Sequence, residues 1–187
     1  MAPPDLRAAG TAPAAEEALV QLCTFRVGGE DYAVDVMRVR EIIRPLPVTP
    51  VPRAPAFVDG VIRLRGEVVP IVDVRRRFGL PVGAAGHKTR FVIVHVAGRR
   101  LGLVVDEVCE VVRLARGDIR AAPRLVGQEG PRFFVGVCGG DGSAQVRGRR
   151  SAATRLRLLL DVRALLEPAV PGEAEAARAQ AEASLRA

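Results

Sequence analysis

Residues 19–36 read LVQLCTFRVGGEDYAVDV, and this stretch decides the fold. Two short apolar segments, residues 19–27 and 32–36, lie on either side of Gly28-Gly29-Glu30-Asp31, a composition typical of a tight hairpin turn. Similar segments separated by glycine follow along the chain, which favours small barrels or a sandwich over a parallel sheet with crossover helices. We therefore predict a mainly β fold. Further strands are expected near residues 61–65, 68–72, 91–96, 100–105, 110–114, 133–137 and 156–160.

The chain also repeats itself. Val34-Asp35 followed by residues 39–43 (VREII) matches Val105-Asp106 followed by residues 108–112 (VCEVV), with an offset of about seventy positions. Either match alone could arise by chance. A second match in the same order makes chance a poor explanation and predicts two similar β subdomains.

That second match joins residues 70–78 (PIVDVRRRF) to residues 158–166 (LLLDVRALL). Asp73 and Asp161 are predicted to cap short helices, because an aspartate carboxylate accepts the free amide hydrogens of a first helical turn. The spacing is 71 between Asp35 and Asp106 but 88 between Asp73 and Asp161. The difference predicts an inserted loop at about residues 139–154, a segment rich in arginine, glycine and serine.

The 187 residues are long enough for one ordinary domain and its core. Residues 1–17, rich in alanine and proline, are predicted to form a flexible tail, and residues 168–187 a tail or short helix. The folded domain is expected over residues 18–167. With no secretory signal pattern and no apolar run near the roughly 20 residues that a membrane span needs, we expect a cytoplasmic protein.

The positive charge offers one functional alternative. The formal net charge is +7, and Lys88 is the only lysine among the basic residues. An arginine-rich β-barrel that binds nucleic acid is therefore an alternative hypothesis. Only 4% of the residues are aromatic, which leaves few stacking platforms for bases, so we expect no nucleic-acid partner.

Catalytic groups are sparse. Three cysteines, Cys23, Cys109 and Cys138, lie in strand-like apolar segments, where a buried thiol has suppressed reactivity. His87 and His95 form no metal-ligand pattern, and no phosphate-binding glycine motif occurs. We therefore expect no enzymatic activity, no metal and no cofactor.

Residues 57–73 are the most informative segment for a binding function. Alternation places Ile62 and Leu64 on a core face, and Gly60 and Gly66 bracket the strand. A glycine beside an apolar groove would let a partner approach closely, whereas the simpler alternative is turn geometry. An ion pair of Arg65 with Glu41 could equally be structural or part of a binding surface.

The chain resembles the CheW family of bacterial chemotaxis adaptors over about residues 19–167. The resemblance rests on five ordered motifs, which are residues 25–35 (FRVGGEDYAVD), 39–42 (VREI), 55–66 (PAFVDGVIRLRG), 69–75 (VPIVDVR) and 102–108 (GLVVDEV). One motif departs from the family pattern, because Arg63 precedes Leu64-Arg65-Gly66 where the family usually has asparagine.

The resemblance implies two intertwined five-stranded β-barrels with a few short helices, and a non-enzymatic adaptor. Its implied partners are the cytoplasmic tip of methyl-accepting chemoreceptors and the regulatory domain of the histidine kinase CheA, with the membrane reached only through the receptors. The receptor groove is expected between the barrels, with Glu41 supporting Arg65 by an ion pair; kinase-binding residues are not assigned. The implied groove residues are Val39, Gly60, Arg65, Gly102 and Val111.

Overall fold

Twelve strands and four short helices make up the described part of the chain. The computed structural model describes residues 19–122, 133–139, 145–146, 149–150 and 155–166. The tails expected at residues 1–17 and 168–187 lie outside the described residues. The strands are β1 (Leu19–Val27), β2 (Glu30–Asp35), β3 (Val39–Ile43), β4 (Val58–Leu64), β5 (Glu67–Asp73), β6 (Arg90–Val96), β7 (Arg99–Val105), β8 (Glu107–Ala115), β9 (Phe134–Cys138), β10 (Gln145–Val146), β11 (Arg149–Arg150) and β12 (Arg157–Leu160). The helices are η1 (Val36–Arg38), α1 (Val74–Arg77), η2 (Arg116–Asp118) and η3 (Ala164–Leu166).

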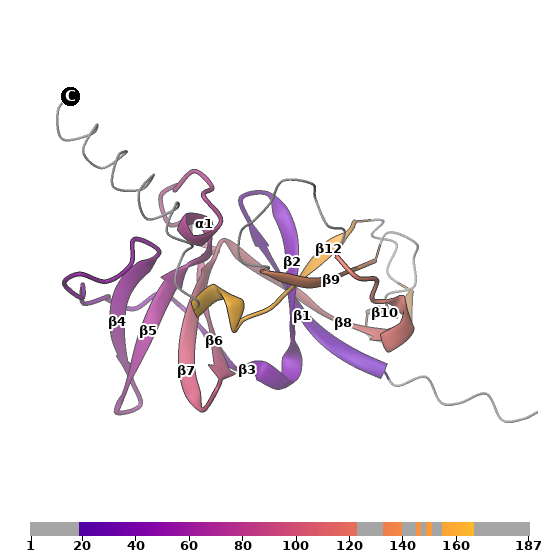
Figure 1. Cartoon of the computed structure of the whole chain (residues 1–187), viewed down its shortest axis with the longest axis horizontal. Coiled ribbons are helices and arrows are strands. Elements are labelled where there is room, and N and C mark those ends of the chain that lie inside the picture. The colour runs from indigo at the N-terminus through magenta and orange to yellow at the C-terminus, as the bar shows by residue number, and fades with distance from the viewer. Residues whose placement is uncertain (1–18, 123–132, 140–144, 147–148, 151–154, 167–187) are drawn as a thin grey trace, which may run out of the picture.

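The strands form two sheets that lie side by side (Figure 1). One has the order β11-β10-β8-β1-β2-β12-β9. Its strands β8, β1, β2, β12 and β9 form what we call barrel A. The other has the order β3-β6-β7-β5-β4 and forms barrel B. The mainly β fold with two five-stranded units and short helices is thus confirmed.

An antiparallel bridge outside the strands closes each barrel. In barrel B, Thr49 pairs with Val61 of β4 through two backbone hydrogen bonds of 2.8 and 2.9 Å. In barrel A, Arg120 pairs with Val137 of β9 through bonds of 2.9 and 2.8 Å. The segment that follows β3 or β8 therefore returns to the far edge of its own sheet.

The two halves of the chain exchange hairpins. Barrel A takes the β1–β2 hairpin from the first half and β8, β9 and β12 from the second; barrel B takes the β6–β7 hairpin from the second half and β3, β4 and β5 from the first. Neither half can form a closed barrel alone, so the barrels are intertwined.

The strand registers correct the repeat derived from the sequence. Ala33 of β2 lies beside Leu159 of β12 as Gly102 of β7 lies beside Ile71 of β5, so the hairpins correspond at an offset of 69. Asp35 is therefore equivalent to Val104, and the predicted match to Asp106 is two positions out of register. That match was wrong because Val34-Asp35 and Val105-Asp106 look alike in sequence, whereas backbone pairing fixes the equivalence.

The registers also show that the residues inserted in the second half lie in two places and not in one loop. The offset is 76 for β4 and β9, because Gly60 pairs with Ile71 as Gly136 pairs with Leu159, and it is 88 for β5 and β12. Seven residues are thus added between β8 and β9 and twelve between β9 and β12. The predicted loop at 139–154 also contains two short strands, β10 and β11, that extend the sheet beyond β8.

The predicted aspartate caps are confirmed. The carboxylate of Asp73 accepts the amide hydrogens of Arg75 and Arg76 at 2.8 and 3.2 Å, and that of Asp161 accepts the amide of Arg163 at 2.9 Å. Asp73 ends β5 and begins α1, whereas Asp161 follows β12 and opens the turn at residues 162–163 that leads into η3.

The two capped helical turns are joined by a buried arginine. The guanidinium of Arg77 in α1 donates to the backbone oxygens of Leu165 and Ala164, at 3.1 and 3.3 Å. It also stacks 4.4 Å from the ring centre of Phe57 and 4.5 Å from that of Phe133. A cation that is 6% exposed is thus compensated by carbonyls and aromatic faces.

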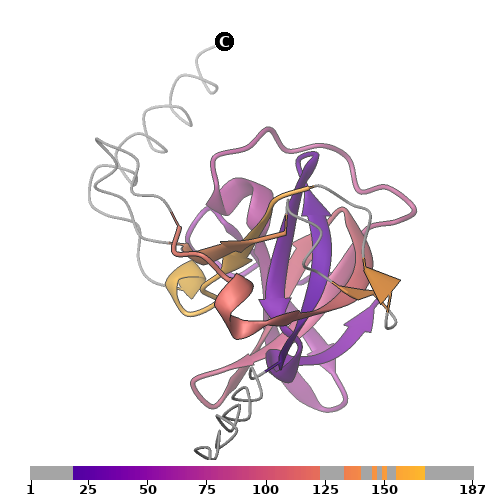
Figure 2. The same cartoon turned by 90° about the vertical axis from the view of Figure 1, so that its right-hand side faces the viewer.

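Three apolar clusters fill the part of the molecule that the structure describes. One, including Leu22 and Val112, fills barrel A, and another, including Ile62 and Ile93, fills barrel B. The largest includes Phe25 of barrel A and Leu103 of barrel B. It fills the seam between the barrels. Figure 2 looks along the long axis, with barrel A in front of barrel B.

Candidate functional site

Gly60 lies where the segment after β3, which contains Thr49 and closes barrel B, crosses β4. It is buried and has φ of +144°. A β-bulge lies between Val58 and Gly60. A Cβ at this position would overlap the backbone oxygen of Thr49 and lie 2.9 Å from Cγ1 of Val48. The absent side chain therefore makes room for this chain's own backbone.

Gly136 occupies the equivalent place in barrel A. A Cβ there would lie 2.7 Å from Cγ2 of Ile119 and 2.8 Å from the backbone oxygen of Arg120, the residue that closes that barrel. Glycine thus recurs at the crossing point in both barrels. Sequence reasoning missed this equivalence, because neither of the two internal matches found in the sequence has an offset of 76 residues.

Gly102, the second implied glycine, is also buried. A Cβ on this residue of β7 would overlap Cδ1 of Ile71 and lie 3.2 Å from Cδ1 of Ile93. Gly102 therefore lets two isoleucines of neighbouring strands meet inside barrel B.

Arg65 is exposed at the tip of the β4–β5 hairpin. Arg65 and Gly66 have φ of +50° and +86°, as a two-residue turn of type I′ requires. The Arg65 guanidinium makes a two-pronged ion pair with the Glu41 carboxylate, with N–O distances of 3.1 and 3.2 Å. The Arg65 side chain is 73% exposed, so this pair contributes on the order of 0–1 kcal/mol to stability. It orients the turn relative to β3.

Val39 and Val111 lie on different barrels. Val39 begins β3, is half-buried and packs against the seam cluster, whereas Val111 of β8 is 45% exposed. Val111 is the register equivalent of Ile42, which is 42% exposed on β3. Each barrel thus presents an exposed branched side chain at equivalent points of β3 and β8.

The arrangement changes the expectation of a groove through the seam. The seam is filled by the largest core cluster, so a partner helix at the junction would have to lie on its rim. Of the five implied residues, the structure exposes Arg65 and Val111, half-buries Val39 and buries Gly60 and Gly102. Two other places on the described surface are hollowed.

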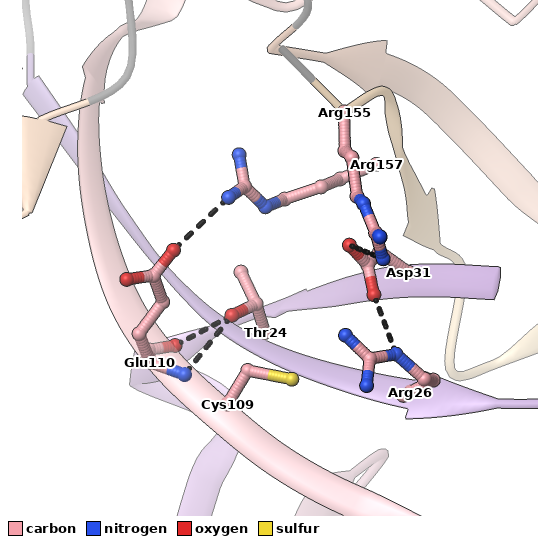
Figure 3. Close-up of a pocket in the computed structure, with 7 residues that line it drawn as sticks. All are labelled: Thr24, Arg26, Asp31, Cys109, Glu110, Arg155 and Arg157. Atoms are coloured by element: carbon pink, nitrogen blue, oxygen red, sulfur yellow. Dashed lines mark hydrogen bonds and ion pairs between the residues drawn. The ribbon is translucent and has the colours of Figure 1, made fainter. Parts of the chain in front are cut away.

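One hollow lies at the mouth of barrel A and has a volume of about 230 Å³ (Figure 3). Its arginines are paired with acids: Arg157, with a side chain 4% exposed, bonds Glu110 at 3.0 Å, and Arg26 bonds Asp31 at 3.2 Å. The lining residues are Thr24, Arg26, Asp31, Cys109, Glu110, Arg155 and Arg157.

The cysteines differ in exposure. Cys23 and Cys138 are buried, as expected, but Cys109 is exposed in this hollow, which corrects the prediction that all three are buried. The prediction failed for Cys109 because it is the outward residue of a half-buried strand. Burial raises the pKa of the Cys109 thiol, an effect that nearby Arg26 only partly opposes. This geometry does not activate the thiol as a nucleophile.

The second hollow, of about 710 Å³, lies on barrel B and is lined by residues of β3, β5, β6 and β7. It is formed by Arg40, Glu67, Val68, Pro70, His95, Gly98, Arg99 and Arg100. None of these residues was predicted as a binding residue from the sequence, because the strand pairing that brings them together is not visible in it.

The described residues include no group of three or more His, Cys, Asp or Glu placed to hold a metal ion. Within the same part of the chain, no helix is long and apolar enough to cross a membrane.

Many of the arginines are neutralised by this chain's own carboxylates. Those with an ion pair include Arg26, Arg65, Arg75, Arg76, Arg100 and Arg157. Such pairing leaves less free charge for phosphates than the composition suggests.

Known proteins share both sequence and fold with this chain. A CheW protein of Treponema pallidum is 34% identical over 121 residues, covering 63% of this chain and 71% of that protein. A CheW protein of Rhizobium meliloti is 38% identical over 117 residues, covering 63% and 76%. The protein FrzA of Myxococcus xanthus is 32% identical over 121 residues, covering 65% and 75%. These matches give no support to the nucleic-acid alternative.

A solved structure has the same fold. The scaffolding protein TtCheW from Thermoanaerobacter tengcongensis superposes with a TM-score of 0.68 at 24% identity, over 90% of this chain and 96% of that one. The sequence pattern of the CheW-like domain matches residues 21–169, which include strands of both barrels. Because the match takes in both barrels and relatives exceed 30% identity, this chain belongs to the CheW-like domain family.

Proposed function

We propose that this protein is a non-enzymatic adaptor that couples chemoreceptors to a CheA-like histidine kinase in a chemosensory pathway. The observation that carries the proposal is the family match across both barrels. Relatives named as chemotaxis proteins, among them those of Treponema pallidum and Rhizobium meliloti, support it.

The duplicated architecture suits a linker. An adaptor needs two separate binding surfaces, and a fold made of two similar barrels offers two similar faces. The register-equivalent Ile42 and Val111 give each barrel an exposed apolar side chain, and such side chains supply affinity when a partner buries them.

For the receptor, we propose a contact on the rim of the seam. Val39 and Val111 would supply apolar area and Arg65 the register, held by Glu41. Gly60 and Gly102 would act from beneath, since Gly60 makes room for the backbone of Thr49 and Gly102 makes room for two isoleucine side chains inside barrel B. The receptor's partner element would be a helical cytoplasmic tip docked lengthwise.

For the kinase, the proposed partner is the regulatory domain, which in this family has the same two-barrel fold. Its contact residues on this chain are not assigned. The protein would act in the cytoplasm and would reach the membrane only through receptor arrays.

The receptor proposal is tested by binding of the full chain to an immobilised cytoplasmic fragment of a chemoreceptor from the same genome. Val111→Glu should weaken binding about tenfold, because it places a charge where an apolar contact forms. Val135→Glu is the matched control, since Val135 is 53% exposed on β9 of the same barrel. Both variants should keep the wild-type circular dichroism spectrum. Equal binding by the two variants would reject the rim contact, and no binding of the wild-type chain to receptor or kinase would reject the adaptor.

A further inference from the structure

The hollow on barrel B brings together residues that are distant in sequence. Arg40 comes from β3, and Val68 and Pro70 come from β5. The β6–β7 hairpin contributes its lining residues from the end of β6, the turn and the start of β7. At about 710 Å³ the hollow could admit several side chains of a partner.

The hollow carries unbalanced positive charge. Arg100 is paired with Glu67 at 3.2 Å, but Arg40 and Arg99 are exposed and make no ion pair with any residue that the structure describes. Glu67 is the only carboxylate among the lining residues. Two guanidiniums are therefore free to bind acidic groups.

The equivalent place in barrel A is different. There Arg155 and Asp31 correspond to Glu67 and Arg100, so the ion pair is reversed, with an N–O distance of 3.9 Å. The other arginines of that hollow are paired with Asp31 and Glu110. Excess positive charge thus distinguishes the barrel B hollow from its counterpart.

Two apolar side chains also line the hollow. Val68 is 70% exposed, and Pro70 lies two residues further along the same face of β5. Aspartate and glutamate side chains place methylene groups beside their carboxylates, so an acidic segment would match both these two apolar side chains and the two arginines.

The hollow also adjoins the proposed receptor contact. Glu67 pairs directly with Leu64 across the hairpin whose tip is Arg65. A segment that reaches Arg65 can therefore extend along β5 into the hollow without crossing the molecule.

We infer that the hollow formed by Arg40, Arg99 and Arg100 docks an acidic protein segment, carried by the same partner that contacts Arg65. The inference rests on the proposed function for the identity of that partner. An acidic protein fits better than a nucleic acid, because no Phe, Tyr or Trp ring lines the hollow for a base to stack on.

The test compares full-length wild-type protein with the double variant Arg40→Glu/Arg99→Glu. The control is Arg116→Glu/Arg163→Glu, which makes the same change in net charge at two exposed positions outside both the hollow and the proposed rim contact. One probe is a fluorescent eight-residue glutamate-rich peptide, measured by anisotropy at several salt concentrations. A single-stranded DNA of similar charge is the second probe, and the chemoreceptor fragment is the third.

We expect the double variant to bind the peptide and the receptor fragment about tenfold more weakly, with a shallower salt dependence, and the control to bind both as the wild type does. Equal losses in both double variants would show only a net-charge effect and would overturn the inference. Tighter wild-type binding to DNA than to the peptide would also overturn it, as would peptide binding that appears only after deletion of residues 168–187, since that segment would then be the occupant.

Failure of this inference can be told from failure of the adaptor proposal. If the wild type binds the receptor fragment and the double variant binds it equally well, the hollow has no docking role while the adaptor stands. If the wild type binds the peptide in the hollow but neither receptor nor kinase, the acidic docking site stands and the adaptor does not.

Discussion

Replacing Gly60 with alanine tests whether the closing crossing holds barrel B together. The new methyl group would overlap the Thr49 oxygen, lie 2.8 Å from the Thr49 carbonyl carbon and sit on a backbone with φ of +144°. Strain at such a backbone position is worth about 1–3 kcal/mol. Displacing Thr49 also breaks its two hydrogen bonds to Val61, each worth about 0.5–1.5 kcal/mol.

The combined loss for Gly60→Ala is therefore about 2–6 kcal/mol in the free energy of unfolding. With a urea m-value of about 2 kcal/mol/M, the midpoint should fall by roughly 1–3 M. Unfolding is best followed by far-ultraviolet circular dichroism, because the chain has no tryptophan and one tyrosine.

Gly98→Ala is the matched control. Gly98 also has positive φ, of +79°, but a Cβ there meets nothing within 4 Å. Its cost should be limited to backbone strain of about 1 kcal/mol, or roughly 0.5 M in the midpoint. A Gly60→Ala midpoint equal to that of Gly98→Ala would refute the closure reasoning, because contact with Thr49 would then add nothing.

Three further outcomes follow from the structure. Arg77→Met should lower the free energy of unfolding by about 2–4 kcal/mol by leaving two buried carbonyls without their donor, and an unchanged urea midpoint would contradict this. Burial raises the pKa of the Asp59 carboxyl despite nearby Arg76, so the folded state binds this proton more tightly than the unfolded chain. Stability is then lost as pH rises through the raised pKa; Asp59→Asn should be more stable than wild type at pH 7, and a gap that does not shrink toward about pH 4 would contradict the linkage. A thiol reagent should label Cys109 before Cys23 and Cys138, yet more slowly than free cysteine near neutral pH because of its raised pKa, and equal labelling of all three would contradict the exposure difference.

Local signals gave reliable predictions because the forces behind them act over a few residues. The glycine turn between β1 and β2, and the caps at Asp73 and Asp161, depend on backbone groups that are sequence neighbours. The Arg65–Glu41 pair was considered from the sequence because both lie in recognisable motifs, and the structure contains it.

Other features depended on contacts between distant segments. The role of Gly60 follows from Thr49, which crosses it only after barrel B has closed. The match of Asp35 to Asp106 was two residues out because only backbone pairing reveals the register. The exposure of Cys109 depended on which face of β8 the barrel turned outward.

The sequence by itself determined a duplicated, mainly β chain and its family, because turn glycines, capping aspartates and ordered motifs are properties of neighbouring residues. Only the tertiary structure decided that the halves exchange hairpins, that the seam is filled, and that Arg40 and Arg99 meet in one hollow. The physical reason is that the exchange joins strands far apart along the chain, and their register is set by packing across both barrels and not by local preference.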